Sequence, residues 1–303
     1  MNQFFIRLNY LNIFAALKIG RLAFKVLKKD LKNIAIQGVS GSFHEEATRK
    51  SFNNQAIEFE FCDTFEQVFL NVKEKNYLGL VAIENSLAGS ILPNYGSIQS
   101  HGLNIIGETY CEIEQNLMVL PSTSLEDVQE IWSHPMALSQ CQSFLNQYPN
   151  IKSVEKEDTA KSARIIKQKK LKNTAAIASH TAAEIYGLKI IKRKVQDHKK
   201  NFTRFLILSK NKTAISTPNK ATLCFSVANQ TGSLAKTLTF LAENEMNLTK
   251  IQSHPIIGRQ WEYFFYIDLL FDSHKKYRYV IANLNNYVSD LNILGAYKNE
   301  INI

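Results

Sequence analysis

Four short polar segments of the sequence place hydroxyl, amide and guanidinium groups beside apolar runs. They are Glu84-Asn85-Ser86, Ser133-His134, Gln140 and Asn201-Phe202-Thr203-Arg204-Phe205. The first two follow directly after predicted strands, and ligands of open α/β sheets bind at such strand ends. Groups of these types, without a metal, suit the binding of a carboxylated small molecule and the transfer of a proton to it.

Other kinds of catalytic site are not indicated. The glycine turn at 38–41 reads Gly-Val-Ser-Gly, which is neither a GxGxxG fingerprint nor a Walker loop, and the sequence has no nucleophile elbow. The four cysteines, at positions 62, 111, 141 and 224, form no CxxC pair and suit a reducing compartment. The patterns therefore give only weak signals for a nucleotide or a metal, and the cysteines suit a cytoplasmic protein.

The elements that must position the polar segments alternate between strand and helix from Asn33 onward. The glycine turn separates a strand over 33–37 from a helix over 43–52. Further strands are predicted at 58–62, 78–83, 103–107, 116–120, 130–133, 174–178 and 205–208, and helices at 64–73, 136–146, 159–167 and 180–186. This alternation is typical of parallel α/β sheets.

A polar linker at 213–220 precedes a second pattern. Over 221–303 the order is strand (222–227), helix (233–243), two strands (248–253 and 263–271), helix (275–288) and strand (291–297). This βαββαβ order is the ferredoxin-like plan. The fold class expected for the whole chain is therefore α/β, followed by a smaller α+β domain.

The length and composition fit a globular chain with more than one folding unit. With 303 residues, 45% hydrophobic and 21% charged, the chain is about twice a typical domain in length and too apolar for a disordered protein. No apolar run approaches the ~18 residues of a membrane span. The net charge is +9, but residues 1–32 hold seven basic residues and one acidic residue, which leaves +3 for the rest. We expect neither a nucleic-acid nor a membrane partner.

Residues 1–32 form an N-terminal extension with two alternative interpretations. The segment is basic and nearly free of acidic residues, as in an organelle targeting peptide, but it lacks the order of features of a secretory signal. The other interpretation is a mis-assigned start. The first would move the protein from the cytoplasm to an organelle.

Taken in order, the motifs resemble those of the prephenate dehydratase family. The matching segments are Ile83-Glu-Asn-Ser86 with Gly89, Ser133-His-Pro135 with Gln140-Cys141, Ala178-Ser179 leading to Tyr186-Gly187-Leu188, and Asn201-Phe-Thr-Arg-Phe205. The resemblance continues through Thr231-Gly-Ser-Leu234 and 248–268, which are similar to the ACT regulatory domain of these enzymes. It covers about 33–297 and implies a two-lobed catalytic part, similar to a periplasmic binding protein, over 33–212. Lobe 1 would hold about 33–112 and 196–212, and lobe 2 about 113–195.

The resemblance implies a cofactor-free lyase reaction on prephenate in phenylalanine biosynthesis. By motif match, Thr203 would donate a proton or a hydrogen bond to the departing hydroxyl, and Asn85 and Gln140 would orient the substrate. Arg204 would pair with a substrate carboxylate. Further substrate contacts are expected from Ser42, Glu84, Ser86, Ser179 and Phe205. Each has a plainer alternative, such as a strand-start threonine for Thr203 or a structural ion pair for Arg204.

The resemblance also implies feedback by L-phenylalanine bound between ACT domains of two subunits, and hence a homodimer or homotetramer. The expected effector residues are Gly232, Ser233, Leu234, Gln252, Ser253, His254 and Pro255. Many family members have Glu-Ser-Arg-Pro where this chain has Gln252-Ser253-His254-Pro255, and the loss of two charges leaves the strength of regulation open.

Two other functions remain open at this point. Arogenate dehydratase performs the same chemistry on the transaminated substrate and shares all of these motifs. A non-catalytic amino-acid sensor could combine the same two-lobed fold with an ACT domain, and such a sensor would not need the Thr203 hydroxyl.

Overall fold

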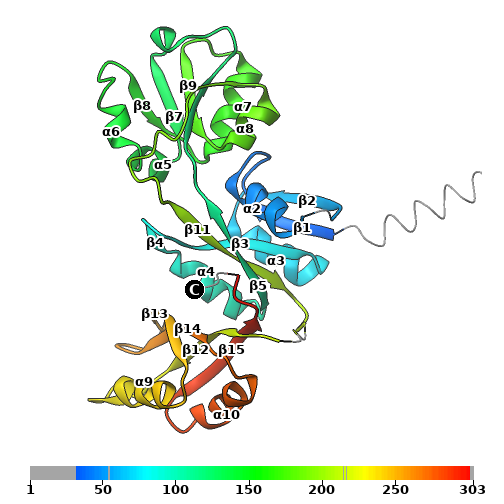
Figure 1. The fold of residues 1–303 in the computed structure, drawn as a ribbon, viewed down its shortest axis with the longest axis vertical. Helices are drawn as coiled ribbons and strands as arrows, with labels where there is room; N and C mark the ends of the chain where they lie inside the picture. Colours follow the sequence, from blue (N-terminus) through cyan, green and yellow to red (C-terminus); the bar gives the residue numbers. More distant parts are fainter. Residues whose placement is uncertain (1–31, 54, 214, 216, 301–303) are drawn as a thin grey trace, which may run out of the picture.

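Three β-sheets follow one another along the long axis of the molecule (Figure 1). The structure is a computed structural model that describes residues 32–53, 55–213, 215 and 217–300. The expectations for residues 1–31 therefore lie outside the described part of the chain. No helix of the described part is long and apolar enough to cross a membrane.

The first sheet has the order β2-β1-β3-β11-β5, with β4 paired to β3. Its strands are β1 (Lys32–Gln37), β2 (Ile57–Cys62), β3 (Leu78–Asn85), β4 (Gly89–Ser90), β5 (Asn104–Glu112) and β11 (Phe202–Ser209). Helices α2 (Phe43–Ser51), α3 (Phe65–Lys75) and α4 (Leu92–Ser100) pack against it. The sheet is held by a core of buried side chains that includes Ile34, Leu80 and Phe205.

The second sheet has the order β10-β6-β9-β7-β8. Its strands are β6 (Asn116–Val119), β7 (Glu130–Ser133), β8 (Lys152–Glu155), β9 (Thr174–Ala178) and β10 (Lys189–Lys192). A 3₁₀ turn, η1 (Leu125–Asp127), and helices α5 (Pro135–Ser139), α6 (Gln142–Leu145), α7 (Thr159–Lys169) and α8 (His180–Tyr186) complete this lobe. Alanines of β9, α7 and α8 form part of its core, so the helices approach the sheet closely.

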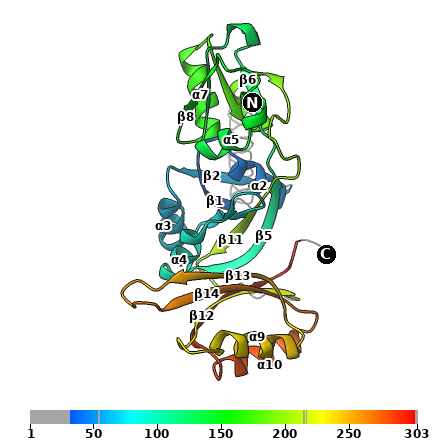
Figure 2. The ribbon, with the colours of Figure 1, turned by 90° about the vertical axis from the view of Figure 1, so that its left-hand side faces the viewer.

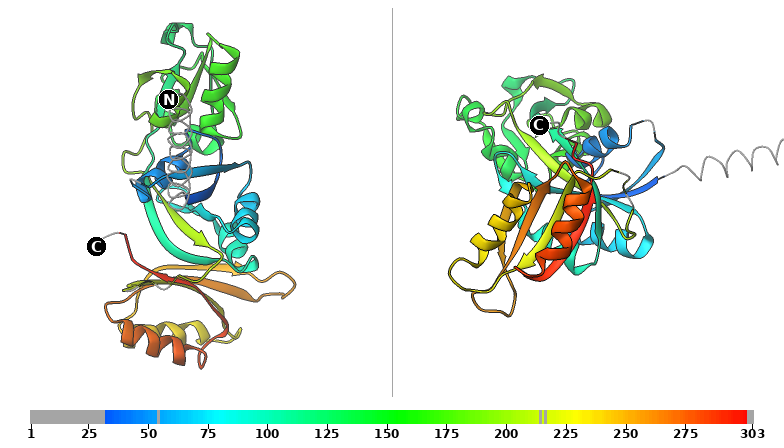
Figure 3. Two further views of the ribbon diagram at one scale, coloured as in Figure 1. Left: turned by 90° about the vertical axis from the view of Figure 1, so that its right-hand side faces the viewer. Right: turned by 60° about the horizontal axis from the view of Figure 1, so that its bottom comes forward.

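The third sheet has the order β13-β14-β12-β15, and all of its pairs are antiparallel. It contains β12 (Lys220–Ser226), β13 (Asn247–Pro255), β14 (Tyr263–Leu270) and β15 (Ser289–Tyr297), with α9 (Ser233–Glu243) and α10 (His274–Leu284). The chain order is βαββαβ, as predicted for the ferredoxin-like plan. Both helices cover the outward face of this sheet (Figure 3), and its other face lies against β5 and β11 (Figure 2).

The first and third sheets share a core. Cys224, Tyr266 and Tyr297 of the third sheet are buried in one cluster with Val81 and Ile105 of the first. At Gly295 a Cβ atom would lie 2.1 Å from the carbonyl oxygen of Ile105, so only glycine fits where the two backbones meet. The two sheets are therefore packed as one body.

The expectation of parallel sheets is only partly right. Strands β2, β1 and β3 are parallel, but β11 runs antiparallel to both of its neighbours, β3 and β5. In the second sheet β6 is antiparallel to β9 and β10. The chain leaves the first lobe after β5, enters the second sheet as β6 and returns to the first sheet as β11, and β6 and β11 each run against both of their neighbours.

The prediction of one continuous helix over 136–146 is wrong. The chain forms α5 and α6 with a break at Gln140 and Cys141. Gln140 ends α5, and its carbonyl oxygen accepts a hydrogen bond from the backbone N–H of Asp197. The break holds the Gln140 side chain at a helix end beside the segment that returns to the first lobe.

Candidate active site

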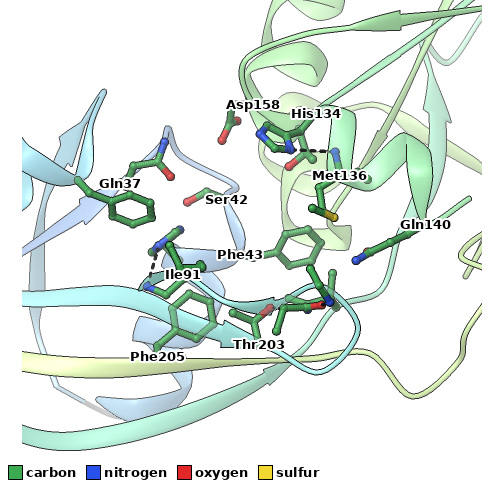
Figure 4. A pocket seen from close by; sticks show the side chains of 18 of the residues that line it. Gln37, Ser42, Phe43, Ile91, His134, Met136, Gln140, Asp158, Thr203 and Phe205 are labelled. Atoms are coloured by element: carbon green, nitrogen blue, oxygen red, sulfur yellow. Dashed lines mark hydrogen bonds between the residues drawn. The ribbon is translucent and has the colours of Figure 1, made fainter. Parts of the chain in front are cut away.

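A cavity of about 600 Å³ lies between the first and second lobes. Its size is in the range of small-molecule sites. Thr203 and Phe205 line one side, and His134, Met136, Gln140 and Asp158 line the other (Figure 4). Of the residues predicted to contact substrate, the cavity brings together Ser42, Asn85, Gln140, Thr203 and Phe205.

Strand pairing places Asn85 beside Thr203. The two are register partners at the ends of β3 and β11. Alternate residues of a strand face the same side, so Thr203 and Phe205 both face the cavity while Arg204 points away. The register shifts after Arg204, which indicates a bulge in β3 that brings both Ala82 and Asn85 to the cavity.

The hydrogen bonds around Asn85 fix the orientation of its amide. Its Oδ1 accepts the backbone N–H groups of Leu87 and Ala88, at 3.0 and 2.9 Å. Its Nδ2 therefore points the other way and donates to Thr203 Oγ1 at 3.0 Å. Since the hydroxyl oxygen accepts this bond, the Thr203 proton is free to be donated toward a ligand in the cavity.

Asn201 extends this arrangement across the two lobes. Its Oδ1 accepts a second bond from Asn85 Nδ2 at 2.7 Å, and its Nδ2 donates to Gln140 Oε1 at 2.9 Å. The Gln140 Nε2 is thereby directed away from Asn201 as a free donor. Asn201 is fully buried. Asn201 belongs to the motif at 201–205, but its residue type and position alone predict no role, because its burial and its two amide partners depend on contacts with distant segments.

The amino terminus of α2 forms another part of the wall. Ser42 caps this helix by accepting the N–H of Glu45 at 3.3 Å, and it lines the cavity. His44 lies in the first turn, and burial lowers its pKa to about 4, so its ring is neutral at neutral pH. Helix N-termini stabilise anions through their free N–H groups and the helix dipole.

The second lobe adds His134 and Asp158, which sequence reasoning did not place in the site. His134 caps α5, and its Nδ1 accepts the N–H of Met136 at 3.2 Å, which leaves Nε2 as the protonated nitrogen of the neutral ring. Asp158 caps α7, and burial raises the pKa of its carboxyl group. From the sequence, both residues could be predicted only as helix caps. Their place in the cavity depends on how the two lobes pack, and the neighbouring sequence does not indicate that packing.

The charge of the cavity is unusual for an anion site. Among the described residues that line it, none is Lys or Arg, while Glu157 and Asp158 are acidic. An anionic ligand would therefore rely on neutral donors such as the Gln140 amide, the Thr203 hydroxyl and backbone N–H groups at helix ends.

The position of Arg204 does not fit its predicted role of pairing with a substrate carboxylate. Its guanidinium is buried on the opposite face of the sheet, where Nε donates to Glu108 Oε2 at 2.7 Å and Nη2 to Tyr297 OH at 3.0 Å. Nη1 is bonded to Asp268 of the third sheet. Since neighbouring strand residues face opposite sides, a threonine in the cavity excludes the next residue from it.

Glu84, Ser86 and Ser179 also lie outside the cavity lining, which corrects their expected substrate contacts. Glu84 pairs with Lys250 Nζ at 3.0 Å. Ser86 closes the end of the strand pair by accepting the N–H of Phe202 at 3.0 Å. Ser179 caps α8 and donates to the carbonyl oxygen of Gly41 at 2.6 Å, which ties the second lobe to the glycine turn of the first.

The residues expected to bind an effector lie at one end of the third sheet. Ser226 at the end of β12 and His254 near the end of β13 are both register partners of Phe264. The loop after β12 leads to Gly232, which adopts φ 84° and precedes α9, where Ser233 and Leu234 begin the helix. Gln252, Ser253 and Pro255 share the end of β13 with His254.

No group of three or more His, Cys, Asp or Glu side chains in the described residues is arranged to bind a metal. The four cysteines are free and buried. Burial raises the pKa of Cys141 to about 12, so its thiol is not a nucleophile.

Relatives with assigned activities resemble most of this chain. It is 32% identical to arogenate dehydratase 2 of Petunia hybrida over 89% of this chain and 72% of that protein. It is 30% identical to the bifunctional chorismate mutase/prephenate dehydratase of Escherichia coli K12, covering 88% of this chain and 71% of that protein.

Solved structures share the fold. Prephenate dehydratase from Arthrobacter aurescens, solved in complex with L-Phe, is 25% identical with a TM-score of 0.80 over 88% of this chain and 90% of that chain. GqqA, described as a novel type of quorum quenching acylase, is 31% identical with a TM-score of 0.79 over 88% of this chain and 98% of that chain. These matches confirm the predicted α/β fold class.

The family model for prephenate dehydratase matches residues 34–213, which include both lobes and the whole cavity described above. Together with the relatives, this match shows that the chain belongs to the prephenate dehydratase family.

Proposed function

We propose that this chain converts prephenate to phenylpyruvate, carbon dioxide and water. The observation that carries the proposal is the fixed amide of Asn85, which leaves the Thr203 hydroxyl as a proton donor facing the cavity. The substrate dianion takes up one proton as the C–O bond of the ring hydroxyl breaks. The electron pair of the breaking carboxylate C–C bond enters the ring, which becomes aromatic.

Each cavity residue has a role that follows from its geometry. Thr203 donates to the departing hydroxyl, and water restores its proton. The Asn85 N–H polarises the Thr203 oxygen, which makes a poor acid a better donor. Gln140 Nε2 and the amino terminus of α2 would bind carboxylate oxygens, and Phe205 would pack on the ring. Aromatisation supplies the driving force, so positioning and protonation suffice.

The experiment compares turnover of prephenate by the full-length protein with that of Thr203→Ala and Thr203→Ser. General acid catalysis contributes about 10²- to 10⁴-fold, so the alanine variant should lose activity by that factor while serine retains most of it. A folded wild-type protein that turns over no substrate would instead support the amino-acid sensor.

Arogenate is the second candidate substrate, and the charge of the cavity favours it on one point. Arogenate carries an ammonium group where prephenate carries a carbonyl, and two acidic residues but no Lys or Arg line the cavity. The first relative named above is an arogenate dehydratase. The ratio of kcat/KM for the two substrates decides between them.

An acylase activity fits the cavity less well. A hydroxyl nucleophile needs an adjacent base that accepts its proton. Asn85 instead donates to Thr203 Oγ1, which favours a hydroxyl that gives up a proton to a ligand.

We propose residues 33–212 as the catalytic part, 213–220 as the linker and 221–303 as an ACT regulatory domain that binds L-phenylalanine. Support comes from the βαββαβ order, from the convergence of the two effector segments and from the relative solved with L-Phe. A homodimer or homotetramer, with the effector between subunits, and a cytoplasmic location complete the proposal. Light scattering with and without phenylalanine tests the assembly.

A further inference from the structure

A second pair of polar residues lies directly behind the pair that faces the cavity. Arg204 follows Thr203 on β11, Glu84 precedes Asn85 on β3, and the two are register partners. Arg204 Nη1 lies 3.9 Å from Glu84 Oε2. The opposite face of the same two strands thus carries one cation and one anion.

This back face is covered by the third sheet, which supplies a partner for each charge. Asp268 of β14 and Tyr297 of β15 bind the guanidinium of Arg204, and Lys250 of β13 binds Glu84. The side chains of Arg204 and Lys250 are each 6% exposed, and that of Asp268 is fully buried. Water screens the pairs of Arg204 only weakly because they are buried, and charge-assisted hydrogen bonds also fix the geometry of the paired groups.

Arg204 is bound in three directions at once. Its Nε, Nη1 and Nη2 contact β5, β14 and β15 through Glu108, Asp268 and Tyr297. A planar guanidinium held at three corners restricts its own backbone, and Thr203 lies one peptide bond away. Lys250 is held in the same manner by Glu84 and by Ser90 of β4, which pairs with the end of β3.

The strand that carries Lys250 also carries part of the proposed effector site. Lys250, Gln252 and His254 alternate along β13, so all three face the first lobe. His254 packs against Tyr266, which belongs to the core shared by the two sheets. A shift of β13 on effector binding would therefore move Lys250 relative to Glu84.

We infer that Arg204 and Lys250 are positioning residues through which the third sheet sets the geometry of Thr203 and Asn85, and that the Lys250–Glu84 ion pair carries the effector signal. This inference rests on the proposed function. It assigns a role in the reaction to two side chains that touch no substrate.

The test uses full-length Lys250→Met, which keeps the length of the side chain and removes its charge. Glu84 is 36% exposed, so water can solvate it in the variant and the fold should be retained. The matched control is Lys276→Met in the same sheet's domain, whose partner Glu245 is exposed. Prephenate turnover, phenylalanine inhibition and calorimetric phenylalanine binding are measured for each protein.

We expect Lys250→Met to bind phenylalanine within about 3-fold of wild type, since its partners, Glu84 and Ser90, lie in the first lobe and not among the expected effector residues. Its kcat should fall by about 10-fold at unchanged KM, as expected when an interaction is lost in the transition state. Inhibition by saturating phenylalanine should largely vanish, and Lys250→Arg should restore it. Lys276→Met should behave as wild type.

Wild-type inhibition in a folded Lys250→Met variant would overturn the inference, as would an active wild-type enzyme that phenylalanine does not inhibit. A wild-type protein without turnover would count against the proposed function itself, so the two failures are distinguishable. If Lys250→Met does not fold, Glu84→Gln removes the same ion pair from the other side. Retained inhibition in a folded Glu84→Gln variant would equally overturn it.

Discussion

Replacing Arg204 by methionine should destabilise the protein far more than removing an exposed ion pair. The guanidinium is 6% exposed and binds Glu108 and Asp268, whose side chains are both fully buried. Without it, only Lys220, 2.9 Å from Glu108, remains as a buried cation for two buried carboxylates. Leaving a buried charge uncompensated costs about 3–5 kcal/mol.

Thermal unfolding of the full-length protein provides the assay. For chains of this size each 1 kcal/mol corresponds to a shift of about 2–4 °C in Tm, so Arg204→Met should melt roughly 6–20 °C lower. The control is Lys75→Met, whose pair with Glu60 is 49% and 42% exposed and should contribute at most about 1 kcal/mol. A Tm within 2 °C of wild type for Arg204→Met would refute the reasoning.

Three further changes test other parts of the structure. Burial lowers the pKa of His44 to about 4, so as the pH falls the unfolded chain protonates this imidazole before the folded protein does. The free energy of unfolding should therefore be fully retained above pH 6.5 and fall by up to about 3 kcal/mol toward pH 4. His44→Gln should remove most of this pH dependence, as measured by urea unfolding. Gly295→Ala should lower Tm by several degrees, because its Cβ would lie 2.1 Å from the Ile105 carbonyl oxygen. Gly96→Ala in α4 is the control, because its Cβ would meet no atom within 4 Å and alanine favours a helix, so its Tm should not fall. Asn201→Leu should lower kcat by about 10- to 100-fold in steady-state assays, since Gln140 and Asn85 lose their common partner, and an unchanged kcat would contradict the amide chain.

The sequence predicts those cavity residues that lie in recognisable motifs near the ends of strands or helices. Asn85, Gln140 and Thr203 were found from their types and motifs, and the structure brings all three to one cavity. For Arg204 the contacts favour the alternative role, a structural ion pair, over pairing with a substrate carboxylate. The two-residue period of a strand already places it on the face opposite to Thr203.

Other features depend on contacts between distant segments. Nothing local in 201–209 indicates that β11 returns between β3 and β5 in the antiparallel sense. The break at Gln140 is stabilised by Asp197, 57 positions further along the chain, and not by a local helix stop signal. Arg204 also pairs with Asp268, and Glu84 with Lys250, and both of these partners belong to the third sheet, far away in the sequence.

The most direct test of the central assignment is the kcat for prephenate of Thr203→Ala and Thr203→Ser beside wild type, with folding verified by circular dichroism. A hydroxyl that donates a proton predicts a loss of at least about 100-fold for alanine and near wild-type turnover for serine. A folded Thr203→Ala protein that turns over prephenate at the wild-type rate would contradict the account.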